Sequence, residues 1–174
     1  MAYSALAIVN YFIEKSIKEQ HFLTQLHLIK MTYLAHAVYF KTEHEALFSD
    51  PVVAWKHGPV IVSIYDKLKC YGNSPVSALI TTLQEVVEDG QIRFQLVCPK
   101  VRETDQKIKD FLDLAWKKLS TVDAWRLRMY SHEPGGAWYE TVKEKGIDPM
   151  DERSLEALPR NLTILDNVIE ACGR

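Results

Sequence analysis

The chain has 174 residues, of which 47% are hydrophobic and 25% charged, a composition typical of one soluble globular domain. Its formal net charge of −2 excludes a general electrostatic attraction to nucleic acid. No apolar stretch approaches the ~20 residues that span a bilayer, and the N-terminus lacks the basic region of a signal peptide. Three widely spaced cysteines without a C-x-x-C pair argue against a disulfide framework or a zinc site: Cys70, Cys98 and Cys172. We therefore expect a cytoplasmic protein.

Two helices are predicted at the start of the chain. Ser4 is a suitable N-cap for the first, in which apolar residues recur at helical spacing: Leu6, Val9, Ile13 and Ile17. Thr24 is a suitable N-cap for the second, which is apolar on most sides and is expected at the centre of the fold. Its polar interruptions are His27, Lys30 and His36. We expect Lys30 to extend its ammonium group into solvent and the histidines to form hydrogen bonds in the core.

An extended run and a helix are predicted on the two sides of Gly58. The run covers Pro51 to Trp55. Pro59 suits the first position of a helix, where its missing N–H costs no hydrogen bond. Apolar residues then follow at helical spacing, namely Ile61, Ile64, Tyr65 and Leu68, and Gly72 is expected to end the helix.

A β-hairpin is predicted over about residues 82–98. Asp89-Gly90 is a two-residue hairpin turn, and after it Ile92, Phe94 and Leu96 alternate with polar residues. Leu83 and Val87 extend the same apolar face before the turn. The alternative is that the first arm is the end of a helix.

Helices are expected again in the last third of the chain. Apolar residues return to helical spacing from Thr104 onward, and the segment Ser120–Asp123 resembles a capping box for a helix that carries Val122, Trp125 and Met129. A short helix is predicted over 138–145, and a last one over Leu162–Ala171 in a tail that begins at residue 146. No repeat or domain boundary is evident. The expected fold is a mainly α, compact single-domain helical bundle over residues 1–174 with one small antiparallel hairpin.

No catalytic or metal motif stands out among the histidines and cysteines. The histidines lack zinc-binding spacing, and there is no Walker loop, G-x-G-x-x-G or G-x-S-x-G. A Cys70–His57 nucleophile pair is conceivable, but Cys70 is better explained as a small apolar filler near a helix end. We therefore expect no enzyme activity, cofactor or metal.

Two segments combine His, Trp, Gly and Pro at expected helix junctions. The first is Ala54-Trp55-Lys56-His57-Gly58-Pro59-Val60 with Tyr65, and the second is Ser131-His132-Glu133-Pro134-Gly135-Gly136-Ala137-Trp138. One interpretation is that the glycines and prolines form turns while the tryptophans fill the core. The other is that the two junctions meet to form one surface that binds a protein, for which Trp and Tyr are common anchors.

The first segment, together with Leu23-Thr24, Leu28-x-Lys30-x-x-Tyr33 and Leu47-Phe48, resembles the Panacea domain of SocA-like antitoxins, also labelled phage-associated GepA-like proteins. Trp125-x-Leu127 and the second segment resemble the second motif of that family, and the resemblance covers roughly residues 4–145. It implies family-signature or partner-binding roles for a set of residues: Lys30, Tyr33, Trp55, His57, Gly58, Pro59, Tyr65, His132, Gly135, Gly136 and Trp138.

The resemblance implies a mostly helical antitoxin that neutralises a toxin encoded beside it. The toxins paired with this domain are mutually unrelated, so their identity stays open, and one branch of the family delivers its toxin to a AAA+ protease. Residues 80–98 and the tail after 146 match the family poorly. Two alternatives are kept: an enzyme with a site built from His57 and His132, and a DNA-binding regulator. The basic group available to the latter is better explained as a solvated face: Lys117, Lys118, Arg126 and Arg128.

Overall fold

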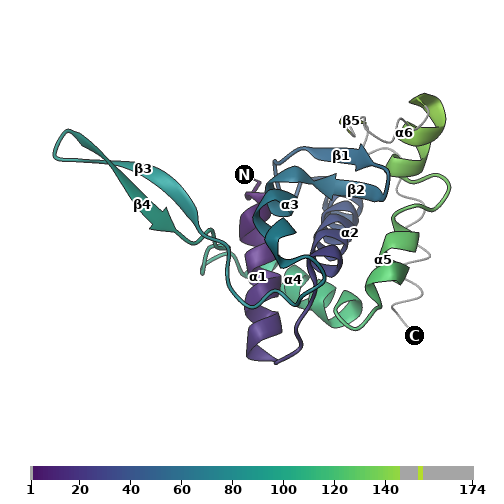
Figure 1. Cartoon of the computed structure of the whole chain (residues 1–174), viewed down its shortest axis with the longest axis horizontal. Coiled ribbons are helices and arrows are strands. Elements are labelled where there is room, and N and C mark those ends of the chain that lie inside the picture. Colours follow the sequence, from purple (N-terminus) through teal and green to yellow (C-terminus); the bar gives the residue numbers. More distant parts are fainter. Residues whose placement is uncertain (1, 146–152, 155–174) are drawn as a thin grey trace.

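The computed structural model describes residues 2–145 and 153–154, and in these residues the fold is mainly helical with two small β-hairpins (Figure 1). Helix α1 covers Ala5–Lys18, and the Ser4 hydroxyl accepts a hydrogen bond from the amide of Ala7 at its start. Helix α2 covers Gln25–Glu43, and Thr24 caps it in the same way through the amide of His27. Both predicted N-caps are confirmed.

Helix α2 lies at the centre of the molecule, as its pattern predicts. Twelve of its residues are buried. It contacts α1, three later helices over residues 62–68, 106–119 and 124–130, and a strand over residues 58–61. The two buried histidines find partners in the core, which confirms the expectation: His27 Nε2 lies 3.2 Å from the carbonyl of Leu119, and His36 Nδ1 accepts from the amide of Phe48 at 3.5 Å.

The segment around Gly58 forms a hairpin, and the prediction of a helix from Pro59 is wrong. Strand β1 (Val52–Trp55) pairs antiparallel with β2 (Gly58–Ile61), with Pro59 opposite Ala54. Residues 56 and 57 form the two-residue loop. Because β2 is an edge strand, the missing N–H of Pro59 costs no ladder hydrogen bond. Pairing with β1 keeps the chain extended through Ile61, and helix α3 begins only at Val62 (Val62–Leu68).

Helix α3 continues into a 3₁₀ turn, η1 (Lys69–Tyr71), and the amide of Gly72 bonds to the carbonyl of Lys69. Gly72 therefore closes this segment, as predicted. Cys70 lies on it and is exposed, so its interpretation as a buried apolar filler is wrong.

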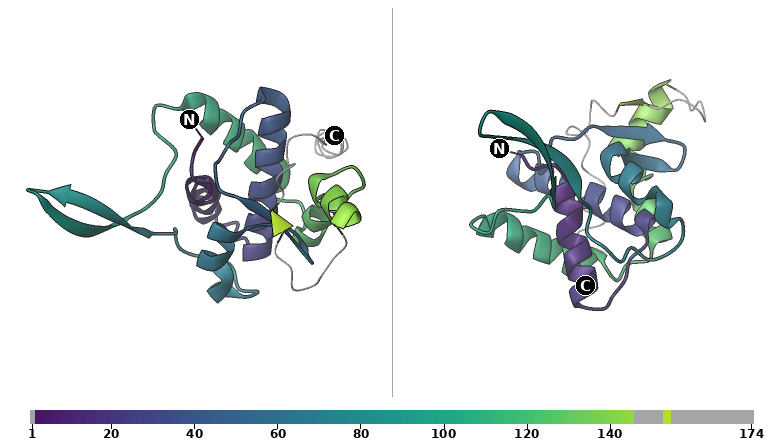
Figure 2. Two further views of the ribbon diagram at one scale, coloured as in Figure 1. Left: turned by 90° about the horizontal axis from the view of Figure 1, so that it is seen from above. Right: turned by 60° about the vertical axis from the view of Figure 1, so that its left-hand side comes forward.

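Strands β3 (Thr82–Glu88) and β4 (Gln91–Val97) form the predicted second hairpin, which excludes the helical alternative. Asp89 and Gly90 have φ of 54° and 72°, which suits a type I′ turn. The hairpin extends away from the helical body as an arm, and a perpendicular view shows the same (Figures 1 and 2).

Three helices follow the arm, namely α4 (Gln106–Leu119), α5 (Ala124–Tyr130) and α6 (Ala137–Lys145). The capping-box prediction at Ser120 is wrong, because the N-cap of α5 is Asp123, whose carboxylate accepts from the amides of Trp125 and Arg126. Trp125 and Met129 lie on α5, and their side chains are exposed rather than buried in the core. Residues Arg153–Ser154 (β5) pair with β1 and complete a sheet of order β2-β1-β5.

The predicted helix over 162–171 lies outside the described residues. Within the described ranges, no helix is both long and apolar enough to cross a membrane.

Candidate functional site

The two signature segments meet around Gly58. Gly58 has a φ of +102°, and a Cβ there would lie 2.5 Å from His132 Cε1, 2.7 Å from Lys30 Nζ and 3.2 Å from Ser131 Oγ. The start of β2, the middle of α2 and the turn after α5 are therefore in direct contact at one point. We call the surrounding residues the Gly58 junction: Lys30, Trp55, Gly58, Pro59, Tyr65, Arg128, Ser131, His132 and Trp138.

Lys30 is buried inside this junction, so the expectation that it reaches solvent is wrong. Its side chain is 1% exposed, and its ammonium nitrogen donates to the Pro59 carbonyl at 2.8 Å. Burial, together with the nearby charge of Arg128, lowers the Lys30 pKa to about 7. Lys30 is therefore a structural donor that ties α2 to the edge strand β2.

His132 is held as a neutral ring in the same place. Its Nδ1 lies 2.6 Å from the Arg128 carbonyl, which only accepts, so Nδ1 carries the proton. Burial, aided by the charges of Lys30 and Arg128, lowers the His132 pKa to about 4. Its Nε2 is buried and has no hydrogen-bond partner among the residues that the structure describes.

Three aromatic side chains join the junction to α6 and α3. The indole N–H of Trp138 donates to the Trp55 carbonyl at 2.8 Å, and its ring packs against His132 with centroids 3.9 Å apart. Trp55 meets Tyr65 edge-on at 4.8 Å. Gly135 precedes α6 with a φ of +87°, and the Gly136 amide bonds to the Glu133 carbonyl at 3.1 Å. The Gly-Gly pair thus forms the turn that brings Trp138 to Trp55.

The remaining signature residues lie in other settings. Tyr33 belongs to the buried core, where desolvation raises the pKa of its phenol. His57 is exposed in the loop between β1 and β2. Arg128 also belongs to the Gly58 junction, although its sequence pattern indicated only a solvated face. Its guanidinium lies 4.5 Å from the Trp125 ring centroid, and its carbonyl holds His132. Trp125 lies at i−3 from Arg128 on α5 and His132 at i+4 in the turn after it, and this helical spacing was the available signal.

The family model for the SocA-like antitoxin, Panacea domain, matches residues 28–139. This span contains the whole Gly58 junction, from Lys30 to Trp138. The chain belongs to the SocA-like antitoxin family. The matched range lies within the predicted range of 4–145. No curated protein and no solved structure matches the chain significantly.

In this Panacea domain, hydrogen bonds to backbone carbonyls hold the elements of the Gly58 junction together. The Lys30 ammonium, the Trp138 indole and His132 Nδ1 bond to backbone carbonyls. Three further polar atoms of the junction are buried without a partner among the described residues: Trp55 Nε1, Arg128 Nε and His132 Nε2. The two histidines of the predicted catalytic site, His57 and His132, lie close enough for the charge of His57 to lower the pKa of His132. His57 is exposed, whereas His132 packs on Trp138. In the part of the chain that the structure describes, no group of three His, Cys, Asp or Glu side chains could hold a metal ion.

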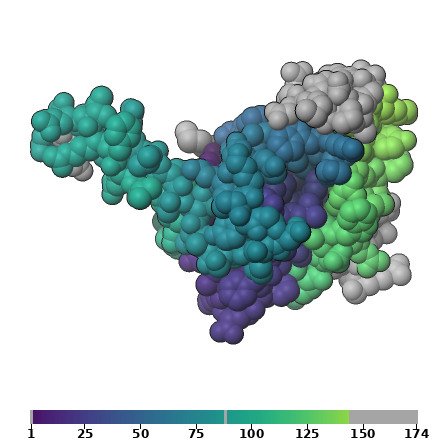
Figure 3. All heavy atoms as spheres, in the orientation of Figure 1, coloured from purple at the N-terminus to yellow at the C-terminus, as the bar shows by residue number. Residues whose placement is uncertain are grey.

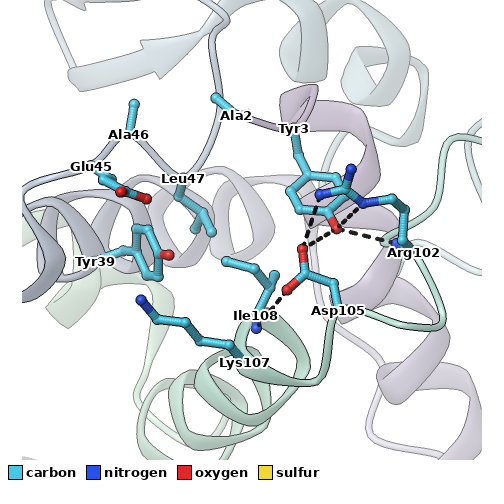
Figure 4. Close-up of a pocket in the computed structure, with 10 residues that line it drawn as sticks. All are labelled: Ala2, Tyr3, Tyr39, Glu45, Ala46, Leu47, Arg102, Asp105, Lys107 and Ile108. Atoms are coloured by element: carbon cyan, nitrogen blue, oxygen red, sulfur yellow. Dashed lines mark hydrogen bonds and ion pairs between the residues drawn. The ribbon is translucent and has the colours of Figure 1, made fainter.

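A separate cavity of about 400 Å³ in the Panacea domain lies between the N-terminus, the loop after α2 and the start of α4 (Figure 4). The Tyr3 hydroxyl donates to the Asp105 carboxylate at 2.6 Å. The Arg102 guanidinium donates to the Tyr3 hydroxyl and to the Asp105 carboxylate, each at 3.2 Å. These polar groups bond to one another across the cavity wall. We therefore interpret them as a network that fastens the N-terminus to α4.

Proposed function

We propose that this chain is the antitoxin of a toxin–antitoxin pair in the cytoplasm and neutralises its toxin by binding it directly. The observation that carries the proposal is the family match over residues 28–139. The Gly58 junction supports it, because the hydrogen bonds from Lys30 to Pro59 and from Trp138 to Trp55 join α2, the β1–β2 hairpin and α6 into one scaffold for binding. We assign the signature residues to this scaffold, and the β1–β2 loop beside the junction exposes Lys56 and His57 to solvent.

The test is co-expression with the product of the adjacent gene. We expect that product to arrest growth when it is expressed alone, and this protein to restore growth and to co-purify with it in a stable complex. A harmless neighbour, or one that stays toxic and unbound, contradicts the proposal. A second experiment repeats the co-expression in hosts that each lack one AAA+ protease. Rescue that persists in all of them indicates inhibition by binding alone, whereas rescue lost in one indicates delivery of the toxin to that protease.

A further inference from the structure

The β3–β4 arm carries an exposed apolar face. The pairing register places Leu83 opposite Leu96 and Val87 opposite Ile92, so these side chains and Phe94 lie on one face of the hairpin. Each is between 65% and 73% exposed. The opposite face is mostly polar and includes Gln84, Gln91 and Gln95. Figure 3 shows the arm projecting from the rest of the molecule.

This face is large for a monomer. Five apolar side chains at this exposure present on the order of 500 Å² of apolar surface, near the upper end of the largest patch on a typical monomer. An isolated two-stranded hairpin is also only marginally stable in water. A partner that covers the apolar face would stabilise the arm as well as bury its surface.

One charge on this face restricts what can cover it. Glu85 lies on the same face as Leu83 and Val87, directly opposite Phe94. Face-to-face packing of two copies about a two-fold axis would place two Glu85 carboxylates in one apolar interface, at a high desolvation cost. A lipid surface would also have to bury this carboxylate. A different protein with apolar side chains and one Lys or Arg can satisfy both the apolar face and Glu85.

The base of the arm is held firmly to the helical body. Asn10, a buried residue of α1, donates from Nδ2 to the carbonyls of Ile80 and Pro99, at 2.9 Å each, and accepts from the Ile80 amide at 2.8 Å. One side chain thus joins both ends of the hairpin. The arm is presented in a fixed place while its apolar face stays outside the core.

We propose that the apolar face of the β3–β4 arm is the surface that binds the toxin, and that the toxin meets it with apolar side chains and a basic residue opposite Glu85. This inference rests on the proposed antitoxin function and deepens it. It assigns recognition to a segment that is separate from the Gly58 junction, so that the scaffold and the contact surface are distinct parts of the chain.

The test uses the full-length protein and the purified product of the adjacent gene. The variant L83T/I92T/F94T removes three apolar side chains from the face, and Q84T/Q91T/Q95T makes three matched changes on the opposite face. We expect the first to weaken binding at least tenfold and to abolish rescue of growth, and the second to behave as wild type. Glu85→Lys should weaken binding more than Glu85→Gln. Because these side chains are exposed, every variant should keep the melting temperature of the wild type.

Each remaining outcome supports or overturns the assignment of the apolar face as the contact surface. If wild type binds and the apolar-face variant binds equally well, the arm is not the contact surface, although the antitoxin function stands. If wild type itself neither binds nor rescues growth, the proposed function fails and the inference fails with it. Light scattering of wild type and of the apolar-face variant tests whether a second copy of this chain binds the apolar face instead. A wild-type dimer that the variant dissociates, with toxin binding unchanged, assigns the face to self-association and overturns the proposal.

Discussion

At the scale of single residues, the Gly58 junction depends on the absence of one side chain. The missing Cβ leaves room for the ammonium group of Lys30 and the ring of His132, and the φ of +102° lies in the region that favours glycine. Lys30 can then reach the Pro59 carbonyl. A buried lysine, a neutral histidine and a glycine are thus one unit, and none of the three can be explained separately.

The variant Gly58→Ala tests this unit. We expect it to lower the free energy of unfolding by more than about 3 kcal/mol, because overpacking at His132 adds to the cost of the left-handed conformation. Chemical denaturation followed by circular dichroism measures the loss. Gly72→Ala is the control, since Gly72 also has a positive φ but nothing lies within 4 Å of its Cβ position. Its φ of 54° and ψ of −121° lie in a region that glycine alone readily adopts, so the change should cost about 1–3 kcal/mol. Equal losses at the two glycines would show that the contacts at Gly58 contribute nothing.

At the scale of elements, the two hairpins have different relations to the core. The β1–β2 hairpin is packed on α2, and all four residues of β2 are buried. The β3–β4 arm is held at its base by Asn10 and leaves its apolar face exposed. Both hairpins turn through two residues, so this difference comes from what each packs against and not from the turn.

We predict that Asn10→Ala weakens the base of the arm and the fold together. The change leaves the Ile80 amide, the buried Ile80 carbonyl and the half-buried Pro99 carbonyl without their partner, which should cost about 2–3 kcal/mol in the free energy of unfolding. Urea denaturation measures this, and faster hydrogen exchange at the Ile80 amide would locate it. The control Asn73→Ala, in an exposed loop, should change stability by less than about 0.5 kcal/mol. A loss that small at Asn10 as well would contradict the anchoring role.

At the scale of the whole molecule, two histidines and one lysine whose pKa values are lowered in the folded state make the free energy of unfolding rise with pH. Burial lowers the pKa of His36 and of His132 to about 4. Between pH 4 and 6.5 the unfolded chain therefore binds more protons than the folded chain does, so the free energy of unfolding rises with pH in that range. Lys30, with a pKa of about 7, extends the rise from pH 7 towards 10.5. Tyr11 and Tyr33 act in the opposite direction above pH 10, because their pKa values are raised in the folded state.

We therefore predict maximal stability at pH 9–10. For Lys30 alone, the free energy of unfolding should rise by about 2 kcal/mol between pH 7 and pH 9, because the unfolded lysine stays protonated while the buried one loses its proton. Urea denaturation at both pH values measures the rise. Lys30→Met should remove it, whereas Lys67→Met, at an exposed position on α3, should retain it. An unchanged rise in Lys30→Met would show that Lys30 does not titrate in this range.

The sequence by itself determined the helix caps at Ser4 and Thr24, the buried character of α2, the Asp89-Gly90 hairpin and the family. These features depend on local periodicity, turn chemistry and motif spacing, which are all present in a linear chain. Only the tertiary structure decided that Gly58–Ile61 is a strand, that Lys30 is buried and that the arm stands free of the core. Those outcomes depend on pairing with β1, on the carbonyl of Pro59 and on the anchoring by Asn10, contacts between segments that lie far apart in the sequence.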